Sequence, residues 1–448
     1  MTTLRRILPL LLLLAAPLAA DPPPRFPHVV LLSVDTLRAD RVSILGRRER
    51  RTTPKLDALL ARGARFTAAR TPEPLTGPAM VSVLTGLHPH DHGATRNGMA
   101  MRPGLPTLPR ILDRRGYRTA AFVGNWTLRG ELTGLGPSFD VYREVFTRKR
   151  WLGLFNDEAD ARDVTDAALG WLRRDLRRHG DRPRLLWVHY VDPHAPYRRR
   201  DDVLASLGVG AAPSKIDRYD GEVAWTDRHA GRLLDELELL LPSEHTLVVF
   251  LADHGESLGE HDYWGHGRHV YDASLRVPLG FTWRGEIPPR TRVDARVSTL
   301  DVLPTVLALL GLPPAPHAAG VDLAPVLRGE AEPDAERVTW HQAHRGAARR
   351  GGRDARTTGL LEVALVTGTA PGRTKEVLDL RRTDRRLFAL DDDPREYAST
   401  VDDASPPSLA LRGWLERVRA ALALADDAPP RVLDDEAMEE LRALGYLE

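Results

Sequence analysis

Continuous apolar runs, rather than alternating ones, recur along the chain. Four of them read HVVLLSVD from residue 28, YRTAAFVG from 117, RLLWVHYVD from 184 and HTLVVFLAD from 245. Short runs rich in β-branched residues predict strands that are buried on both faces. Residues 163–178 and 219–241 lie between these runs and have the apolar spacing of helices. The pattern predicts an α/β fold, with a large, mostly parallel or mixed sheet sandwiched by helices.

Polar side chains follow three of these runs where the predicted strand ends. They are Asp35, Asp192 with His194, and Asp253 with His254. Ligands of open α/β sheets bind at the carboxyl ends of strands, so these side chains are expected to converge. Two carboxylates and an imidazole suit a divalent cation such as Mn²⁺, Zn²⁺, Mg²⁺ or Ca²⁺. The alternative is that the aspartates only cap the helices that follow the strands.

The segment PEPLTGPAMVSVLTGLHPHDHG, residues 72–93, places Thr76, Gly77 and Pro78 directly before an apolar helical run. Threonine is an ordinary N-cap residue, and proline is common in the first turn of a helix. The amino end of a helix is also where an anionic ester group binds. The residues alone leave open whether Thr76 is a nucleophile or a cap.

The composition and the hydrophobic pattern of the chain change after about residue 345. The basic, glycine-rich stretch ARRGGRDARTTG is followed by LLEVALVTGT, TKEVLDLRR and RRLFALDDDP, which predict successive antiparallel strands, and then by a helical stretch at 408–424. We therefore expect an α/β domain at residues 26–345, a small antiparallel subdomain at 346–405 and a helical tail at 406–448.

The first twenty residues have the layout of a secretory signal peptide. Arg5 and Arg6 precede an apolar run at residues 7–14 and small residues up to Ala20. The run is too short to span a bilayer comfortably, and the prolines at 22–24 would detach a buried helix from the fold. The sequence predicts an exported protein, periplasmic or extracellular, cleaved near Asp21 and without an integral membrane span afterwards.

Composition excludes several classes of function. The 448 residues include 63 Lys and Arg against 62 Asp and Glu, a net charge of +1, which gives no overall attraction to nucleic acid or to an anionic membrane. There is no cysteine, so disulfides, thiolate metal ligands and a cysteine nucleophile are all excluded.

Six motifs occur in an order that resembles the sulfatase family of the alkaline phosphatase superfamily. They are VVLLSVDTLRAD, LTGLHPHDHG, HYVDPHAPY, LADHGESLGEHDYWGHG with YDASLRVPL after it, VSTLDVLPTVLALLGLP and RRLFALDDDPREYAST. The resemblance implies an alkaline phosphatase-like sandwich with a small C-terminal subdomain. It also implies hydrolysis of a sulfuric or phosphoric ester at one metal ion.

The resemblance further implies roles for individual residues. Asp35, Asp253 and His254 match metal ligands, and Thr76 falls at the nucleophile position, where it also touches the metal. His194 matches the histidine that contacts the ester, and His266 falls where many relatives have a lysine near the leaving oxygen. Asn125 falls in the substrate pocket. The histidines at 88, 90, 261 and 269 are expected to be polar loop residues near the site.

Departures from the family pattern bear on the nucleophile. Sulfatases typically have Cys or Ser, any residue, Pro, any residue, Arg, and oxidise the first residue to formylglycine. The same frame here begins with Thr76 and ends with Met80. Oxidation of a threonine would give a ketone, so formylglycine cannot form. Asn125 and Thr127 replace an expected lysine and histidine, and Thr36 replaces one of two paired aspartates. The cation ligands persist, whereas cationic groups of the sulfate pocket are lost.

Three hypotheses follow from these residues. The first is a metal-dependent ester hydrolase or transferase that uses unmodified Thr76. The second is a conventional sulfatase with its nucleophile elsewhere, Ser82 being the nearest serine. The third is a catalytically inactive, secreted binding protein. The aromatic residues Trp126, Tyr197, Tyr263 and Trp264 are compatible with a small-molecule, glycan or lipid ester, and the oligomeric state stays open.

Overall fold

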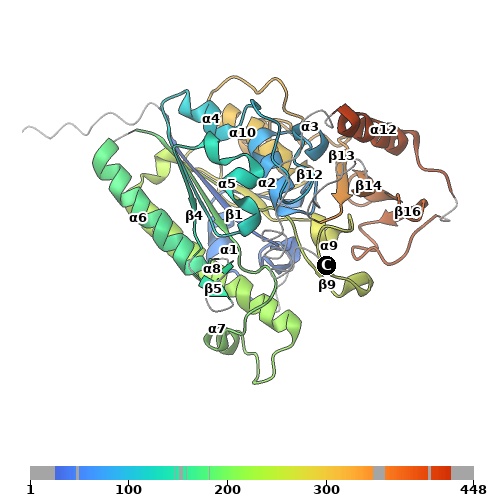
Figure 1. Cartoon of the computed structure of the whole chain (residues 1–448), viewed down its shortest axis with the longest axis horizontal. Coiled ribbons are helices and arrows are strands. Elements are labelled where there is room, and N and C mark those ends of the chain that lie inside the picture. Colours follow the sequence, from blue (N-terminus) through green and yellow to red (C-terminus); the bar gives the residue numbers. More distant parts are fainter. Residues whose placement is uncertain are drawn as a thin grey trace, which may run out of the picture.

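A mixed eight-stranded sheet forms the centre of the computed structural model, which describes residues 26–46, 50–146, 148–150, 155–157, 159–180, 182–346, 359–401 and 405–424 (Figure 1). The expected signal peptide, the basic linker and the last part of the tail lie outside these residues. In spatial order, the strands are β12 (Thr291–Ser298), β2 (Ala64–Arg70), β11 (Leu279–Thr282), β8 (Thr246–Ala252), β1 (His28–Val34), β7 (Arg184–Tyr190), β3 (Arg118–Val123) and β4 (Val141–Glu144).

The four strands predicted from continuous apolar runs lie side by side in the middle of the sheet. β8, β1, β7 and β3 are mutually parallel, and every residue of β1 and of β7 is buried. The sheet is mixed because β11 runs antiparallel to both of its neighbours, β8 and β2. The predicted α/β fold with a mostly parallel, mixed sheet is confirmed.

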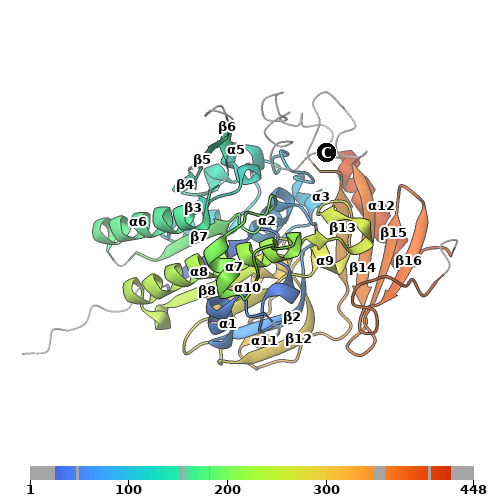
Figure 2. The ribbon, with the colours of Figure 1, turned by 90° about the horizontal axis from the view of Figure 1, so that it is seen from below.

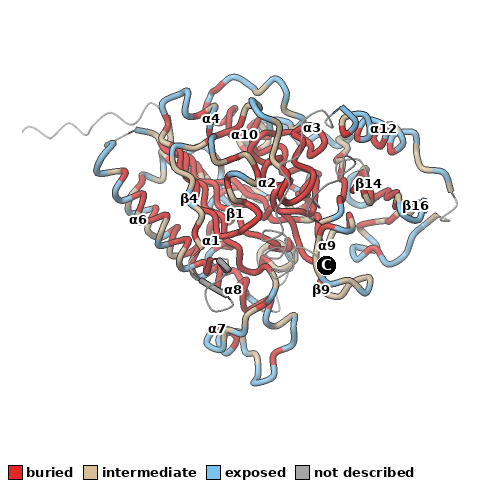
Figure 3. Tube along the Cα trace, in the orientation of Figure 1, coloured by how far each residue is buried: buried red, intermediate tan, exposed pale blue. Residues whose placement is uncertain are grey.

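Helices cover both faces of the sheet (Figures 1 and 2). One face carries α1 (Pro54–Ala61), α6 (Ala161–His179) and α8 (Lys215–Leu240); the other carries α2 (Thr76–Thr85), α4 (Leu108–Asp113) and α10 (Val302–Leu309). The central strands and the inner faces of these helices are buried, whereas the outer faces are exposed (Figure 3). α8 begins at a capping box formed by Ser214 and Asp217.

Short elements connect these layers. They are α3 (Pro89–His92), α5 (Gly130–Thr133), α7 (Asp201–Ser206), α9 (Asp272–Leu275), α11 (Ala324–Leu327) and two hairpins, β5 (Arg148–Arg150) with β6 (Phe155–Asp157) and β9 (Ser257–Leu258) with β10 (Trp264–Gly265).

A second, four-stranded antiparallel sheet lies at one end of the molecule. It consists of β13 (Thr339–His344), β14 (Leu360–Thr367), β15 (Thr374–Asp379) and β16 (Asp384–Ala389), and α12 (Leu409–Leu424) packs on it. The last three strands and α12 are the elements predicted from the sequence. The sheet also includes β13, which precedes residue 345, so the antiparallel unit begins at Thr339 rather than at 346.

The strand β13 is bonded to the loop that precedes α2. The Gln342 amide donates to the Pro72 carbonyl at 3.0 Å, and the His344 amide donates to Glu73 Oε1 at 2.8 Å. His341 Nδ1 lies 2.8 Å from the Thr71 carbonyl. The approach to α2 is therefore held by the small sheet as well as by the large one.

Candidate active site

Two buried carboxylates meet where adjacent strands end. Val34 at the end of β1 pairs with Ala252 at the end of β8, so Asp35 and Asp253 follow at the same edge of the sheet. The amides of Thr36 and His254 donate to Asp253 Oδ1 at 3.2 and 2.7 Å. Asp253 Oδ2 is buried and has no hydrogen-bond partner among the described residues. Burial raises the pKa of Asp253, because a carboxylate is poorly solvated there in the absence of a cation.

His254 faces both carboxylates and Thr76. Its Nε2 lies 3.7 Å from Asp35 Oδ1, 3.6 Å from Asp253 Oδ2 and 3.2 Å from Thr76 Oγ1. Its Nδ1 lies 2.9 Å from the Gly255 carbonyl, which only accepts, so Nδ1 carries the proton. Burial lowers the pKa of His254, which keeps the ring neutral and leaves a lone pair on Nε2. This nitrogen can bind a cation or accept the proton of Thr76.

Thr76 is buried and is the first residue of α2, whose N-cap is Leu75. The amide of Gly77 in the first turn of α2 donates to Asn97 Oδ1 at 2.9 Å, whereas the Thr76 hydroxyl caps no amide and is directed to His254. The capping interpretation is therefore not supported by the geometry.

A histidine that was not singled out from the sequence joins the carboxylates. His189 lies on β7 opposite Ser33 of β1, and one ligand atom each from Asp35, His189 and Asp253 lie within 4.8 Å of one another. Burial lowers the pKa of His189 to about 3, so the ring is neutral. The signal available in the sequence was a polar residue inside an otherwise apolar strand.

Asn125 supports Asp35. Its Nδ2 donates to Asp35 Oδ2, and its Oδ1 accepts from both the amide and the hydroxyl of Thr127, each at 2.7 Å. The structure therefore directs this amide to a metal-site carboxylate and to Thr127.

His194 and His266 gather around His254. Ring centroids are 5.3 Å apart for His194 and His266, and 4.3 Å apart for His254 and His266. His194 Nδ1 lies 2.7 Å from the Ala195 carbonyl, and burial and the neighbouring His266 lower the pKa of His194. The structure thus brings together all the residues predicted from the sequence to form the site.

A carboxylate that sequence reasoning missed holds His266. Glu256 Oε1 lies 3.0 Å from His266 Nδ1, and Glu256 Oε2 accepts a hydrogen bond of 3.0 Å from the Tyr197 hydroxyl. Glu256 is fully buried, and it comes from the same segment as Asp253 and His254. Tyr197 was considered only as an aromatic surface for the leaving group.

The geometry does not favour Ser82 as the nucleophile. It lies inside α2, buried, with its hydroxyl 2.9 Å from His92 Nε2. His92 Nδ1 accepts a hydrogen bond from the Ala94 amide, so Nε2 carries the proton and donates to Ser82. A donating nitrogen cannot serve as the base for this hydroxyl.

The four histidines that the sequence placed in polar loops have packing roles. His88 and His90 are buried against Trp414 of α12, and His90 belongs to α3 rather than to a loop. His261 stacks on Tyr271, and His269 bonds to Glu362 of β14. These four side chains therefore connect the large domain to the C-terminal unit.

The donor set fits a divalent cation. Carboxylates, neutral imidazoles and a hydroxyl converge, and buried atoms such as Asp253 Oδ2 and His189 Nε2 have no hydrogen-bond partner in the described part of the chain. Oxygen and nitrogen donors of this kind bind Mn²⁺, Zn²⁺ and related ions.

In the described ranges, no helix is both long and apolar enough to cross a membrane.

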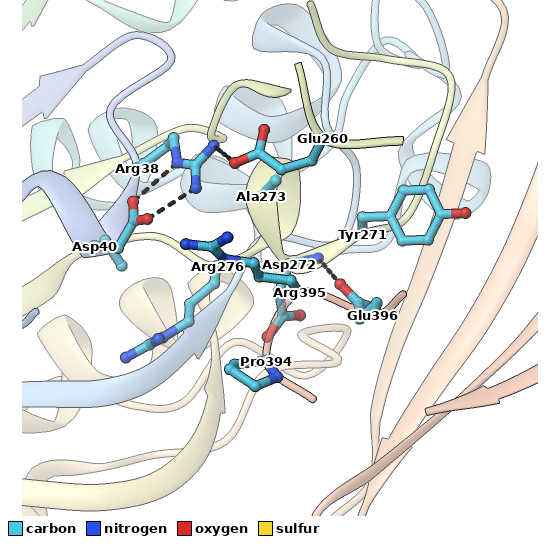
Figure 4. Close-up of a pocket in the computed structure, with 11 residues that line it drawn as sticks. Arg38, Asp40, Glu260, Tyr271, Asp272, Ala273, Arg276, Pro394, Arg395 and Glu396 are labelled. Atoms are coloured by element: carbon cyan, nitrogen blue, oxygen red, sulfur yellow. Dashed lines mark hydrogen bonds and ion pairs between the residues drawn. The ribbon is translucent and has the colours of Figure 1, made fainter. Parts of the chain in front are cut away.

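A second polar cluster, drawn in Figure 4, contains none of the predicted catalytic residues. In it, Arg38 binds Asp40 through two hydrogen bonds of 2.8 Å and Glu260 through one of 2.8 Å, while Glu396 accepts from the Asp272 amide at 2.5 Å. Its charges are largely paired with one another, which indicates a structural role.

The amino-acid sequence of the chain is similar to those of known sulfatases. The chain is 27% identical over 318 residues to the uncharacterized sulfatase YidJ of Escherichia coli (strain K12), covering 57% of this chain and 62% of that protein. It is 28% identical over 374 residues to arylsulfatase A of Homo sapiens, covering 71% of each.

Solved structures share the fold. The putative sulfatase yidJ from Bacteroides fragilis superposes with a TM-score of 0.68 at 21% identity, over 91% of this chain and 99% of that one. The phosphonate monoester hydrolase of Agrobacterium radiobacter superposes with a TM-score of 0.67 at 21% identity, over 91% and 97%. The Sulfatase family model matches residues 27–312, which include every residue of the candidate site. The chain belongs to the sulfatase family and has its alkaline phosphatase-like fold.

Proposed function

We propose that this protein is a metal-dependent hydrolase of sulfuric or phosphoric esters in which unmodified Thr76 attacks the ester, displaces the leaving alcohol and forms an adduct that water then cleaves. The observation that supports this most strongly is the direction of the Thr76 hydroxyl. It caps no helix and faces the lone pair of His254 Nε2 at 3.2 Å, beside two buried carboxylates. A hydroxyl in this position can lose its proton and attack without first becoming an aldehyde.

Asp35, Asp253, His254 and Thr76 would hold the cation. Because the lone pair of His254 Nε2 would then be bound, the proton of Thr76 would leave to water rather than to this ring. When bound, a divalent cation supplies positive charge that lowers the pKa of the attacking hydroxyl and stabilises charge on the attacked group. Asn125 keeps Asp35 in place through its amide. His194 contacts the non-bridging oxygens of the ester, since its ring is fixed by the Ala195 carbonyl and adjoins His266.

His266 donates a proton to the leaving oxygen. Glu256 accepts from Nδ1, so a proton given to the leaving oxygen would come from Nε2. Only a ring that carries a proton on both nitrogens can keep the bond to Glu256 and donate from Nε2. Glu256 is a positioning residue, and Tyr197 holds it in turn.

The chemical class of ester is tested directly. Relatives include proteins named steryl-sulfatase and choline-sulfatase, and structural neighbours include phosphonate monoester hydrolases. Nitrophenyl sulfate, phosphate, phosphodiester and phosphonate esters should be assayed with Mn²⁺, Zn²⁺, Mg²⁺ and Ca²⁺. Metal-dependent turnover of at least one ester that is lost in Thr76→Ala supports the proposal.

The competing candidate is a catalytically inactive binding protein. The observation in its favour is the loss of cationic groups, with Met80, Asn125 and Thr127 at the positions concerned. Absence of turnover with every ester and metal, together with saturable binding of one ester, would establish this alternative and contradict ours.

We also propose that the protein is exported, on the strength of Arg5, Arg6 and the leucine-rich start. Amino-terminal sequencing of protein from an extracytoplasmic fraction should find a start near Asp21. Recovery of intact Met1 from that fraction would indicate an uncleaved anchor instead.

A further inference from the structure

The register of the central sheet places a third side chain beside the two carboxylates. His189 of β7 pairs with Ser33 of β1, and Ser33 in turn pairs with Leu251 of β8. Residues that pair directly share a face of the sheet, and residues two apart in a strand share it as well. His189 therefore lies on the face toward which β1 and β8 continue into Asp35 and Asp253.

The polar atoms of this cluster are close without being bonded to one another. His189 Nε2 and Asp253 Oδ2 are both buried and lack a hydrogen-bond partner within the described residues. Ligand atoms of His189, Asp253 and Asp35 nevertheless lie within 4.8 Å of one another. Two ligands of one ion, each about 2.1 Å from it, lie no more than about 4.2 Å apart, so this grouping is close to the spacing of a shared cation.

The other nitrogen of the ring is already engaged. His189 Nδ1 lies 2.8 Å from the Ser33 hydroxyl, and this hydroxyl also accepts from Trp187 Nε1 at 2.9 Å. A hydroxyl oxygen has two lone pairs, so it can accept from both rings. When Nδ1 donates to Ser33, Nε2 presents its lone pair to the carboxylates, as a metal-bound histidine requires.

Thr36 reduces the number of carboxylate ligands that the end of β1 can offer to a cation. It stands beside Asp35 at a position where the family resemblance led us to expect a second aspartate, and its buried Oγ1 has no hydrogen-bond partner in the described structure. The site therefore has one carboxylate fewer than expected from the first strand. The neighbouring strand β7 brings an imidazole to the same cluster.

We infer that His189 is a direct ligand of the cation through Nε2, and that the site consequently selects a transition-metal ion such as Zn²⁺ or Mn²⁺ over Ca²⁺ and Mg²⁺. This inference rests on the metal of the proposed function. With His254, His189 gives two nitrogen donors beside Asp35, Asp253 and Thr76. Ca²⁺ binds six to eight oxygen ligands and Mg²⁺ a near-octahedral oxygen set, whereas imidazole suits Zn²⁺ and Mn²⁺ better.

Metal binding, rather than activity, is the direct test. The full chain is stripped with a chelator, and titration calorimetry with ZnCl₂, MnCl₂, CaCl₂ and MgCl₂ then measures affinity and stoichiometry. We expect one Zn²⁺ or Mn²⁺ per chain, bound at least tenfold more tightly than Ca²⁺. His189→Phe, which preserves ring volume without a donor, should lose at least tenfold of the Zn²⁺ affinity and most of the preference over Ca²⁺.

A matched variant controls for the loss of a buried histidine. His28 is also buried but lies at the opposite end of β1, where its Nδ1 accepts from the Arg184 amide at 3.2 Å, so His28→Phe should leave Zn²⁺ affinity and selectivity at the wild-type values. Unchanged affinity and selectivity in His189→Phe would overturn the inference.

X-ray absorption of the Zn²⁺-loaded wild type gives an answer even where the variant does not fold. Two imidazole ligands, from His189 and His254, are expected, and a shell with a single imidazole would overturn this two-histidine site while leaving the metal and the proposed function in place. If the wild type binds none of the four ions, both this inference and the metal of the proposed function fail. Binding with no turnover of any ester would contradict the proposed function alone.

Discussion

The Thr76 hydroxyl provides the clearest test at the scale of single residues. If it is the nucleophile, Thr76→Ala should abolish turnover while the fold and bound metal remain, and Thr76→Ser should retain partial activity because its hydroxyl occupies the same place. Thr85 offers a matched control, since it is also buried in α2 and its hydroxyl bonds only to backbone groups, the Val81 carbonyl at 2.7 Å and the Leu87 amide at 3.3 Å. Thr85→Ala should cost about 1 kcal/mol of stability and leave turnover unchanged.

Steady-state kinetics measures the turnover of these variants. Trapping of a phosphoryl or sulfuryl adduct on Thr76 tests the role of Thr76 as nucleophile directly. Full activity of Thr76→Ala on any ester that the wild type hydrolyses would remove Thr76 from this role.

The pair of His266 and Glu256 predicts a dependence on the leaving group. His266→Asn should lower kcat for alkyl esters by about 10²–10⁴-fold but affect nitrophenyl esters far less, because a good leaving group departs without a proton. Glu256→Gln should show the same selectivity more weakly, and the two changes together should be no worse than His266→Asn alone. Kinetics on both kinds of ester check this.

Glu260→Gln is the control for that series, because Glu260 lies on the same segment but binds Arg38. Equal losses for alkyl and nitrophenyl esters in His266→Asn would exclude the acid role. Additive losses in the double variant would instead remove Glu256 from the positioning role.

His92 predicts a pH dependence of stability. Burial lowers its pKa to about 3, against about 6.5 in an unfolded chain. Between these pH values, the unfolded state binds a proton that the folded state does not, so His92 lowers the free energy of unfolding by about 1.4 kcal/mol per unit of falling pH. In urea unfolding from pH 6 to 4, His92→Gln should therefore lose stability less steeply than the wild type. Parallel curves would contradict the assignment of a neutral His92.

At the scale of elements, sequence reasoning was most accurate where a strand is apolar on both faces. β1, β3, β7 and β8 are of this kind and form the contiguous centre of the sheet. β2 and β12 also belong to it, but each has residues that are exposed or half-buried, which interrupt the apolar pattern. β11 has only four residues, and its antiparallel direction depends on long-range pairing that no local pattern encodes.

The residues of the candidate site likewise divide into those that the sequence predicted and those that it did not. Asp35, Asp253 and His254 were predictable because each follows a strong strand signal. His189 was missed because it lies inside a strand, where its neighbours make a buried packing role the ordinary expectation. Glu256 was missed because its contact with His266, ten residues further on, is made by the short β9–β10 hairpin, which no apolar pattern marks in the sequence.

The contact between the C-terminal sheet and the large domain depends on buried charges. Lys375 of β15 is fully buried; its Nζ donates to the Val270 carbonyl at 2.9 Å and to Asp272 at 2.5 Å, and lies 2.8 Å from Glu396. Lys375→Met should therefore lower the free energy of unfolding by about 3–5 kcal/mol, since it leaves carboxylates buried without their partner. Chemical denaturation measures this loss.

Lys55 is the exposed counterpart, paired with Asp235 at 2.8 Å. Lys55→Met should cost less than about 1 kcal/mol, because exposed ion pairs contribute little. Losses of similar size in the two variants would show that the buried network holds the sheet no better than a surface pair does.

At the scale of the whole molecule, the proposed cation should couple activity to stability. Asp35 and Asp253 are buried together, so removing the cation leaves their repulsion uncompensated. A chelator should lower the melting temperature and abolish turnover, and a hundredfold excess of metal over its Kd should restore about 2.7 kcal/mol. The variant Asp253→Asn should show a much smaller response. A chelator-insensitive melting curve, with no metal by elemental analysis, would contradict the ligand assignment.

The bonds between β13 and the loop before α2 bear on how this protein can evolve. The family-defined segment ends at residue 312, yet the loop before α2 is tied to residues 341–344. Recombination that exchanged the small sheet for that of a relative would also replace the support of this loop, which leads to the proposed nucleophile Thr76. The two units are therefore expected to be inherited together, and the smallest transferable module extends beyond the family segment through β13 and its partner strands.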